Sequence, residues 1–333
     1  MGSARRGYRG AVSPFTRVVA LTAVAAGAVA ALAVGLAAVQ SDPVGVAERR
    51  TEPRSGAPPL TLELGVRGDD EALALRRAAA LYADGKRLEA GRTFARFRSL
   101  EAKVGRALSA WPEDTVDRLN RLAGLHPQRA VVQLNLGLAL FWARLAGAED
   151  AWRAAAESEP DTPYAVAAGN LLHPEYAPGL PVFVTTVPIP NGRDSLSPAD
   201  QLERLRLGAG SGVAGKLLYG VALQRLGRQR SAQRVFAAAA RAEPANAEAQ
   251  VAAAVARFDK ARPAESFSRL GPLTRRFPGR ATVRFHLGLL LLWSGEVAEA
   301  RTQLLRATTT EPRSVLARQA RRYLDELDAA GVG

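Results

Sequence analysis

The sequence predicts an all-α protein in which an array of antiparallel helix pairs follows one N-terminal transmembrane helix. Three observations lead to this prediction. The C-terminal third repeats the same residue types every 34 residues, and a long uncharged stretch lies near the N-terminus. The composition is rich in Ala, Leu and Arg with only 6% aromatic residues, which favours helices over aromatic-rich strands.

The repeat is clearest over residues 213–314, where three units align without a gap. Each unit has a small residue in its predicted first helix and another small residue that opens the second helix, so the two helices can approach closely. Larger apolar residues fill the space between units, and a proline ends the second helix. The equivalent positions are Gly220, Ala254 and Gly288; Ala232, Ser266 and Ala300; Phe236, Leu270 and Leu304; Ala239, Leu273 and Ala307; and Pro244, Pro278 and Pro312.

This pattern resembles the tetratricopeptide repeat (TPR) family, and in particular its membrane-anchored bacterial members. The resemblance implies a TPR-like α-solenoid, a right-handed superhelical array that serves as a binding scaffold. Gly271-Pro272 departs from the pattern inside a predicted second helix and is expected to kink or shorten it. The family's aromatic residue near the start of the first helix is also missing, since Lys216, Gln250 and Arg284 stand there.

The remaining chain divides around these clean units. Residues 69–172 are predicted to form degenerate repeats, and residues 198–212 a helix and connector in which Ser197 caps the first turn. Residues 315–333 are predicted to form a capping helix, because one face of it is apolar and the other charged. The apolar face consists of Leu316, Ala320, Tyr323, Leu324 and Leu327.

The N-terminal residues predict a membrane anchor. Residues 18–40 are long enough to cross a bilayer as a helix, and the basic tail 1–17 is expected to stay in the cytoplasm. The repeats would then be extracytoplasmic on a flexible linker, residues 41–68, or secreted if the apolar stretch is a cleaved signal peptide. Gly27, Ala31 and Gly35 at four-residue spacing would allow two such helices to form a homodimer.

A proline-rich apolar insertion, residues 173–197, interrupts the repeats. Its centre, Val182 to Val187, is β-branched and aromatic, which favours extended chain. Such a segment is poorly suited to full solvation, so we expect it to pack on the array. Two arrangements remain open: the segment lies in the groove of the array and occupies it until a partner competes, or it packs over the outside.

The predicted partner-binding site is an apolar groove lined by the first helices of the units. An extended or helical apolar segment of a protein would suit it, and the alternative is that these residues are simply interior. The candidate residues are Leu134, Leu138, Phe141, Trp142, Leu217, Val221, Val255, Phe258, Phe285, Leu289 and Trp293.

The net charge of +13 permits a second function, the binding of a polyanion such as anionic lipid, wall polymer or nucleic acid. Nucleic acid is the least favoured of these, since no basic run is interleaved with aromatics. Codon bias in a GC-rich genome would also enrich arginine without any such function. The candidate surface consists of Arg225, Arg228, Arg230, Arg275, Arg276 and Arg280.

No catalytic arrangement is apparent. The chain has no cysteine, and His126, His173 and His286 show no metal-ligand spacing. The sequence therefore predicts no catalytic residue, no metal site and no cofactor. We expect a non-enzymatic, membrane-tethered scaffold that holds an unidentified protein or peptide and organises a complex at the cell envelope.

Overall fold

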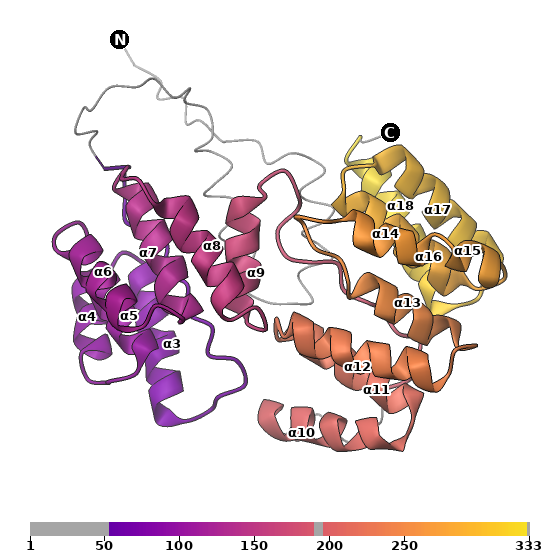
Figure 1. Cartoon of the computed structure of the whole chain (residues 1–333), viewed down its shortest axis with the longest axis horizontal. Coiled ribbons are helices and arrows are strands. Elements are labelled where there is room, and N and C mark those ends of the chain that lie inside the picture. The colour runs from indigo at the N-terminus through magenta and orange to yellow at the C-terminus, as the bar shows by residue number, and fades with distance from the viewer. Residues whose placement is uncertain (1–52, 190–195, 332–333) are drawn as a thin grey trace, which may run out of the picture.

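The computed structural model describes residues 53–189 and 196–331, and all regular secondary structure in these ranges is helical (Figure 1). The first half contains α3 (Asp70–Ala83), α4 (Arg87–Phe94), α5 (Leu100–Ser109), α6 (Thr115–Leu125), α7 (Ala130–Trp142), α8 (Ala148–Ser158) and α9 (Pro163–Leu172). The second half contains α10 (Pro198–Gly208), the 3₁₀ helix η1 (Ala209–Ser211), α11 (Val213–Arg225), α12 (Gln229–Ala242), α13 (Ala247–Val255), α14 (Ala264–Leu270), α15 (Leu273–Arg276), α16 (Ala281–Trp293), α17 (Val297–Thr310) and α18 (Val315–Ala329).

The helices are arranged in two layers in each half. Consecutive helices pack against each other, and the first helix of each pair also packs against the first helix of the next pair. One layer therefore runs through α3, α5, α7 and α9, and its counterpart in the second half runs through α11, α13, α16 and α18. This arrangement is an all-α solenoid, as the repeat pattern predicted.

The small residues of the repeat lie where two helices cross closely. A Cβ atom added to Gly220 would come within 2.3 Å of the Phe236 ring, and one added to Gly288 would come within 2.9 Å of Leu304. In these two units the glycine thus accommodates the large apolar residue that the same repeat places on the second helix. The small residues and the large apolar residues that recur in the repeat therefore contact each other between the two helices of a pair.

Helix ends follow the predicted signals. Ser197 Oγ accepts a hydrogen bond from the Asp200 amide at 3.2 Å and donates one to the Asp200 carboxylate, with Pro198 in the first turn. Gly271-Pro272 divides the second helix of the middle unit into α14 and α15, as predicted. The capping helix forms as α18, and its predicted apolar face is buried except for Tyr323, which is partly buried.

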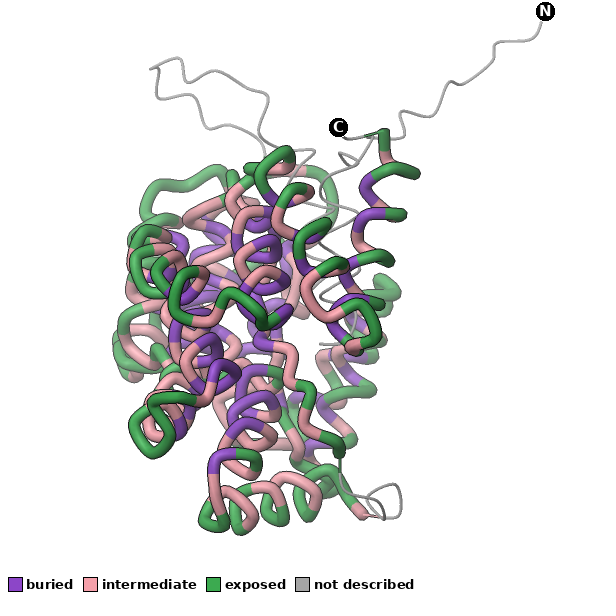
Figure 2. Tube along the Cα trace, turned by 90° about the vertical axis from the view of Figure 1, so that its right-hand side faces the viewer, coloured by how far each residue is buried: buried purple, intermediate pink, exposed green. Residues whose placement is uncertain are grey.

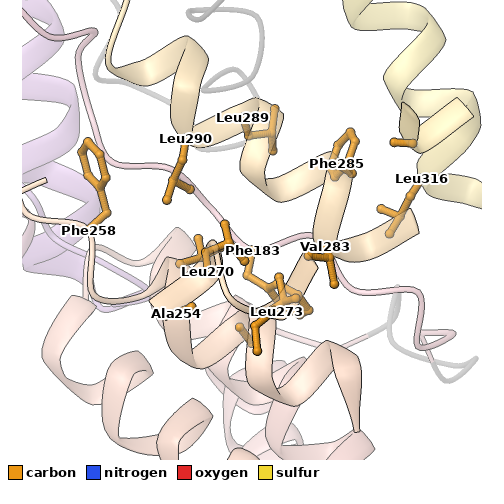
Figure 3. Close-up of a cluster of buried hydrophobic side chains, with 14 of the residues drawn as sticks. Phe183, Ala254, Phe258, Leu270, Leu273, Val283, Phe285, Leu289, Leu290 and Leu316 are labelled. Atoms are coloured by element: carbon orange, nitrogen blue, oxygen red, sulfur yellow. The ribbon is translucent and has the colours of Figure 1, made fainter. Parts of the chain in front are cut away.

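Buried apolar residues form two separate clusters, one in each half. The first extends from Leu64 to Leu171 and the second from Ala177 to Leu327. Figure 2 shows buried positions on the inward-facing sides of the helices, while exposed positions lie on the outer turns. The second cluster includes Phe183, which belongs to no helix (Figure 3).

The predicted membrane anchor is not among the described residues. Within residues 53–189 and 196–331, no helix is both long and apolar enough to span a bilayer. The predicted tail 1–17 and transmembrane helix 18–40 lie outside these ranges, as do the first residues of the predicted linker.

Candidate functional site

The non-helical residues 177–189, which we call the strap, lie along the first helices of the second half. Their backbone is bound in turn by side chains from α11, α16 and α13. Figure 1 shows the strap leaving α9 and passing among the helices of the second half. Of the two arrangements left open by the sequence, the structure thus shows the insertion inside the groove. Residues 190–195 of the predicted insertion lie outside the described residues.

The groove binds the strap mainly through its backbone amides. The Phe183 amide donates to Gln224 Oε1 at 3.0 Å, and the Val184 amide donates to His286 Nε2 at 2.9 Å. The Thr186 amide donates to Glu248 Oε1 at 3.1 Å. Glu248 also accepts from the hydroxyls of Thr185, at 3.0 Å, and Thr186. Three polar side chains of the groove therefore accept hydrogen bonds from the strap.

The aromatic ring of Phe183 anchors the strap. Its side chain is 0% exposed, stacks on the His286 ring with centroids 4.8 Å apart, and meets the edge of Phe236 at 5.6 Å. In Figure 3 it lies between Leu270, Leu273 and the helix that carries Val283. Burial of a phenylalanine side chain contributes roughly 1.5–3 kcal/mol relative to its exposure, so this contact holds the strap in place.

The hydrogen bonds of His286 define which tautomer is present. Its Nδ1 lies 2.7 Å from the Thr282 carbonyl, which can only accept, so Nδ1 carries the proton. Nε2 is then the acceptor that the Val184 amide requires. Burial lowers the pKa of His286 to about 4, although the hydrogen bond to Thr282 raises it. The neutral imidazole is thus the form that holds the strap.

A second extended segment, residues 54–64, lies along the first helices of the first half. Thr61 and Asn135 exchange two hydrogen bonds of 3.0 Å, from the Thr61 amide to Oδ1 and from Nδ2 to the Thr61 carbonyl. The Glu63 amide donates to the Tyr164 hydroxyl at 2.9 Å, and the Tyr82 hydroxyl donates to the Pro58 carbonyl at 2.6 Å. We call these residues the N-terminal segment.

The prediction of a flexible linker over 41–68 is therefore wrong for the N-terminal segment. Its prolines and charged residues predicted an unpacked tether, because they show no lasting apolar period. Composition does not reveal, however, that helix side chains elsewhere in the chain bind the backbone of such a segment. Asn135, in the middle of an apolar helix, was the sequence signal for this contact, since a buried amide requires hydrogen-bond partners.

The predicted groove residues do not line an open surface. Phe141 and Trp142 are half-buried, and Arg54 lies over the Phe141 ring at 4.1 Å. The others are at most 9% exposed, among the packed helices or beneath the extended segments: Leu134, Leu138, Leu217, Val221, Val255, Phe258, Phe285, Leu289 and Trp293. The groove is thus filled by the chain itself. Sequence reasoning placed Gln224 on the inner face but gave no binding role to it or to Asn135, Glu248 and His286, which bind the filling segments.

The predicted arginine surface is divided between two places. All six arginines are exposed. Three of them, Arg225, Arg228 and Arg230, lie at the turn inside one helix pair, whereas Arg275, Arg276 and Arg280 lie where one pair joins the next. Because the chain reverses at every turn, these two kinds of turn lie on opposite edges of the array. The six arginines do not form one continuous patch.

A cleft of about 850 Å³ lies between the two halves, and the strap begins at its wall. Lys260 Nζ donates to Asn170 Oδ1 and to the Ala177 carbonyl, both at 2.7 Å. Asn170 Oδ1 also accepts from the Gly179 amide at 2.8 Å. Burial lowers the pKa of Lys260 to about 7, with the charge of Glu175 opposing this effect. Lys260 thus connects α9, the strap and the second half.

Comparison with models of known protein families and with curated proteins finds none that matches this chain.

Proposed function

We propose that this chain is a non-enzymatic scaffold of the TPR type that binds extended segments of protein in the groove formed by its first helices. The strap and the N-terminal segment are internal occupants of that groove. The strap is the exchangeable one, and a partner segment takes its place. In this proposal the right-handed superhelix presents the groove, and residues 18–40 tether it to the outer side of the cytoplasmic membrane.

One observation carries the proposal. Asn135 and His286 hold the same position of the repeat, since each directly precedes the Leu-Gly pair of its first helix. Each binds the backbone of an extended segment, Asn135 at Thr61 and His286 at Val184. Backbone groups are common to all polypeptides, so side chains aimed at them suit binding of extended chain in general.

The strap itself is attached in a way that permits exchange. It forms no helix or strand, and its hydrogen bonds are made with side chains, which can serve another backbone equally well. A tethered segment competes at an effective concentration of roughly millimolar, so a free partner must bind better than the strap to replace it.

The test is capture of a labelled peptide of residues 178–189 by the full-length chain. We expect Phe183→Ala, which removes the anchor of the strap, to bind the peptide at least about tenfold more tightly than the unmodified chain. Phe267→Ala, on the second helix α14, is the matched control and should behave like the unmodified chain. Should Phe183→Ala damage the fold, the double variant Thr185→Ala/Thr186→Ala keeps Phe183. Absence of peptide binding in both folded strap variants would refute the proposal.

The second candidate function is polyanion binding by the arginine-rich turns. Its support is that Arg225, Arg228, Arg230 and Arg275 are exposed and form no ion pair with a described carboxylate. Their division between two edges makes this the weaker candidate. Its test is binding of the full-length chain to vesicles with and without anionic lipid over a range of salt, because phosphate-type contacts weaken steeply with ionic strength.

A further inference from the structure

Glu248 is a buried carboxylate without a cationic partner among the described residues. It lies in the first turn of α13, is 7% exposed, and belongs to none of the ion pairs in the described ranges. Its partners are neutral: the hydroxyls of Thr185 and Thr186 and the Thr186 amide. A buried carboxylate is costly unless its charge is compensated, and hydroxyls do this only in part. The strap therefore leaves a negative charge in the groove.

Gln224 shows a second incomplete contact with the strap. Its Oε1 accepts from the Phe183 amide, which defines the orientation of the side-chain amide. Its Nε2 is buried and has no hydrogen-bond acceptor among the described residues. A buried donor without an acceptor costs free energy. The strap thus fits the groove sterically, through Phe183, but leaves two polar groups poorly matched.

We propose that the partner of this groove is an extended protein segment with a bulky apolar residue in the place of Phe183 and a lysine or arginine in the place of Thr185 or Thr186. This inference rests on the proposed function, and it specifies the chemistry of the ligand. The basic side chain forms the ion pair that Glu248 lacks, and a backbone carbonyl of the segment accepts from Gln224 Nε2.

The charge of the partner explains how it competes with the tethered strap. The hydroxyls of Thr185 and Thr186 donate hydrogen bonds to the Glu248 carboxylate but carry no charge. A lysine or arginine adds a Coulombic attraction between opposite charges, which water screens less at a buried site than at the surface. The apolar anchor is shared by strap and partner, so it does not discriminate between them. Glu248 discriminates between them, because its carboxylate favours a cationic side chain over threonine and threonine over an acidic side chain. The strap then has a lower affinity for the groove than the partner, because it lacks one positively charged residue.

The experiment measures affinities of labelled peptides for the full-length chain carrying Phe183→Ala. The peptides are residues 178–189 unchanged and with Thr186→Lys, Thr186→Val or Thr186→Glu, and a matching series at Thr185. We expect lysine to improve binding about tenfold at one of the two positions and glutamate to weaken it by at least as much. Glu248→Gln in the same background keeps an acceptor oxygen and should remove the preference for lysine.

Each outcome separates this inference from the proposed function. If all peptides bind with equal affinity, the groove binds extended chain regardless of its charge. The inference is then overturned while the proposed function stands. Retention of the lysine preference in Glu248→Gln would also overturn it, because the cation would then pair elsewhere. If no peptide binds, the proposed function itself fails. The thermal unfolding of Glu248→Gln, compared with its parent, shows whether the groove is intact.

Discussion

The carboxylate of Glu311, at the end of one repeat, binds the first amide of the helix that begins the same repeat. Its Oε2 accepts from the Ala281 amide at 2.8 Å. Glu159 makes the same 2.8 Å bond to Ala130 in the first half. In both places the residue before the helix is an arginine, Arg129 or Arg280, that pairs with the same carboxylate. In each place a free helix amide is thus satisfied by a residue 30 or 29 positions further along the chain, and this contact joins the two ends of one repeat.

Removal of this contact should destabilise the protein. We expect Glu311→Ala to lower the free energy of unfolding by about 1 kcal/mol, as loss of a helix N-cap does. Glu311→Gln keeps an acceptor and should cost less. Glu299→Ala, an exposed site on α17, is the matched control. Denaturant unfolding followed by circular dichroism measures all three. Equal stability of Glu311→Ala and the control would show that the contact contributes nothing.

Substitution of Gly220 tests the close approach of the two helices in a repeat. Alanine there would place Cβ at 2.3 Å from Phe236 Cε1, so the helices must separate. We expect Gly220→Ala to cost about 1–3 kcal/mol, as overpacking does. Gly169→Ala, in α9, meets no atom within 4 Å and should be neutral or stabilise by about 0.5–1 kcal/mol. Thermal unfolding measures the change in stability of each variant. Changes of opposite sign would distinguish the effect of close packing from that of helix propensity. A stable Gly220→Ala would mean that the helices are not closely packed at this point.

His286 should make stability fall in mild acid. Its pKa in the folded state, about 4, is lower than the ordinary value of 6.5. The unfolded state therefore binds more protons between these values, and stability present above pH 6.5 is lost as pH falls toward 4. From pH 7 to pH 5 the loss amounts to about 2 kcal/mol.

The check on His286 is the difference between the unmodified chain and His286→Gln. Glutamine can accept from the Val184 amide and does not titrate, so this variant should lose about 2 kcal/mol less over the same pH range. The half-buried histidines His126 and His173 are present in both proteins, so they do not affect the difference between them. Parallel pH profiles would show that His286 is not the titrating group.

Lys260 should make stability rise in alkali. Its pKa, about 7 in the folded protein, is below the ordinary 10.5, so the unfolded state again binds more protons in this window. The contribution of Lys260 to stability is thus greatest above pH 10.5 and falls as pH decreases toward 7. Between pH 7 and pH 9 we expect a gain of about 2 kcal/mol.

Lys260→Met isolates this effect, because methionine retains an unbranched apolar side chain without a titrating group. The gain between pH 7 and pH 9 should be absent from the variant. Loss of the bonds to Asn170 and Ala177 should also lower its stability at pH 9. The same gain in both proteins would mean that Lys260 is charged and solvated in the folded state.

Much of the helical framework follows from local signals in the sequence. The 34-residue interval located the helix pairs of the second half, because the small residues, the large residues and the prolines recur together. Ser197 and Gly271-Pro272 predicted a helix start and a break that the structure confirms. These features depend on neighbours within one or two helical turns or within one repeat, so a single sequence contains them.

The site depends on contacts that local patterns do not contain. The predicted groove residues are buried or half-buried, but the sequence left open whether they are exposed or covered. Val184 meets His286 across 102 residues, and Thr61 meets Asn135 across 74. An extended proline-rich segment has no periodic pattern of residues that would indicate which helices it contacts.

The sequence by itself determined the class of fold, the repeat and the order of the helices, since these arise from spacing along the chain. Only the tertiary structure decided that the inner faces of both halves are filled, and by which segments. The physical reason is that buried Asn135, Gln224, Glu248 and His286 must find hydrogen-bond partners. Which backbone supplies those partners is settled by packing in three dimensions, where the strap and the N-terminal segment meet them.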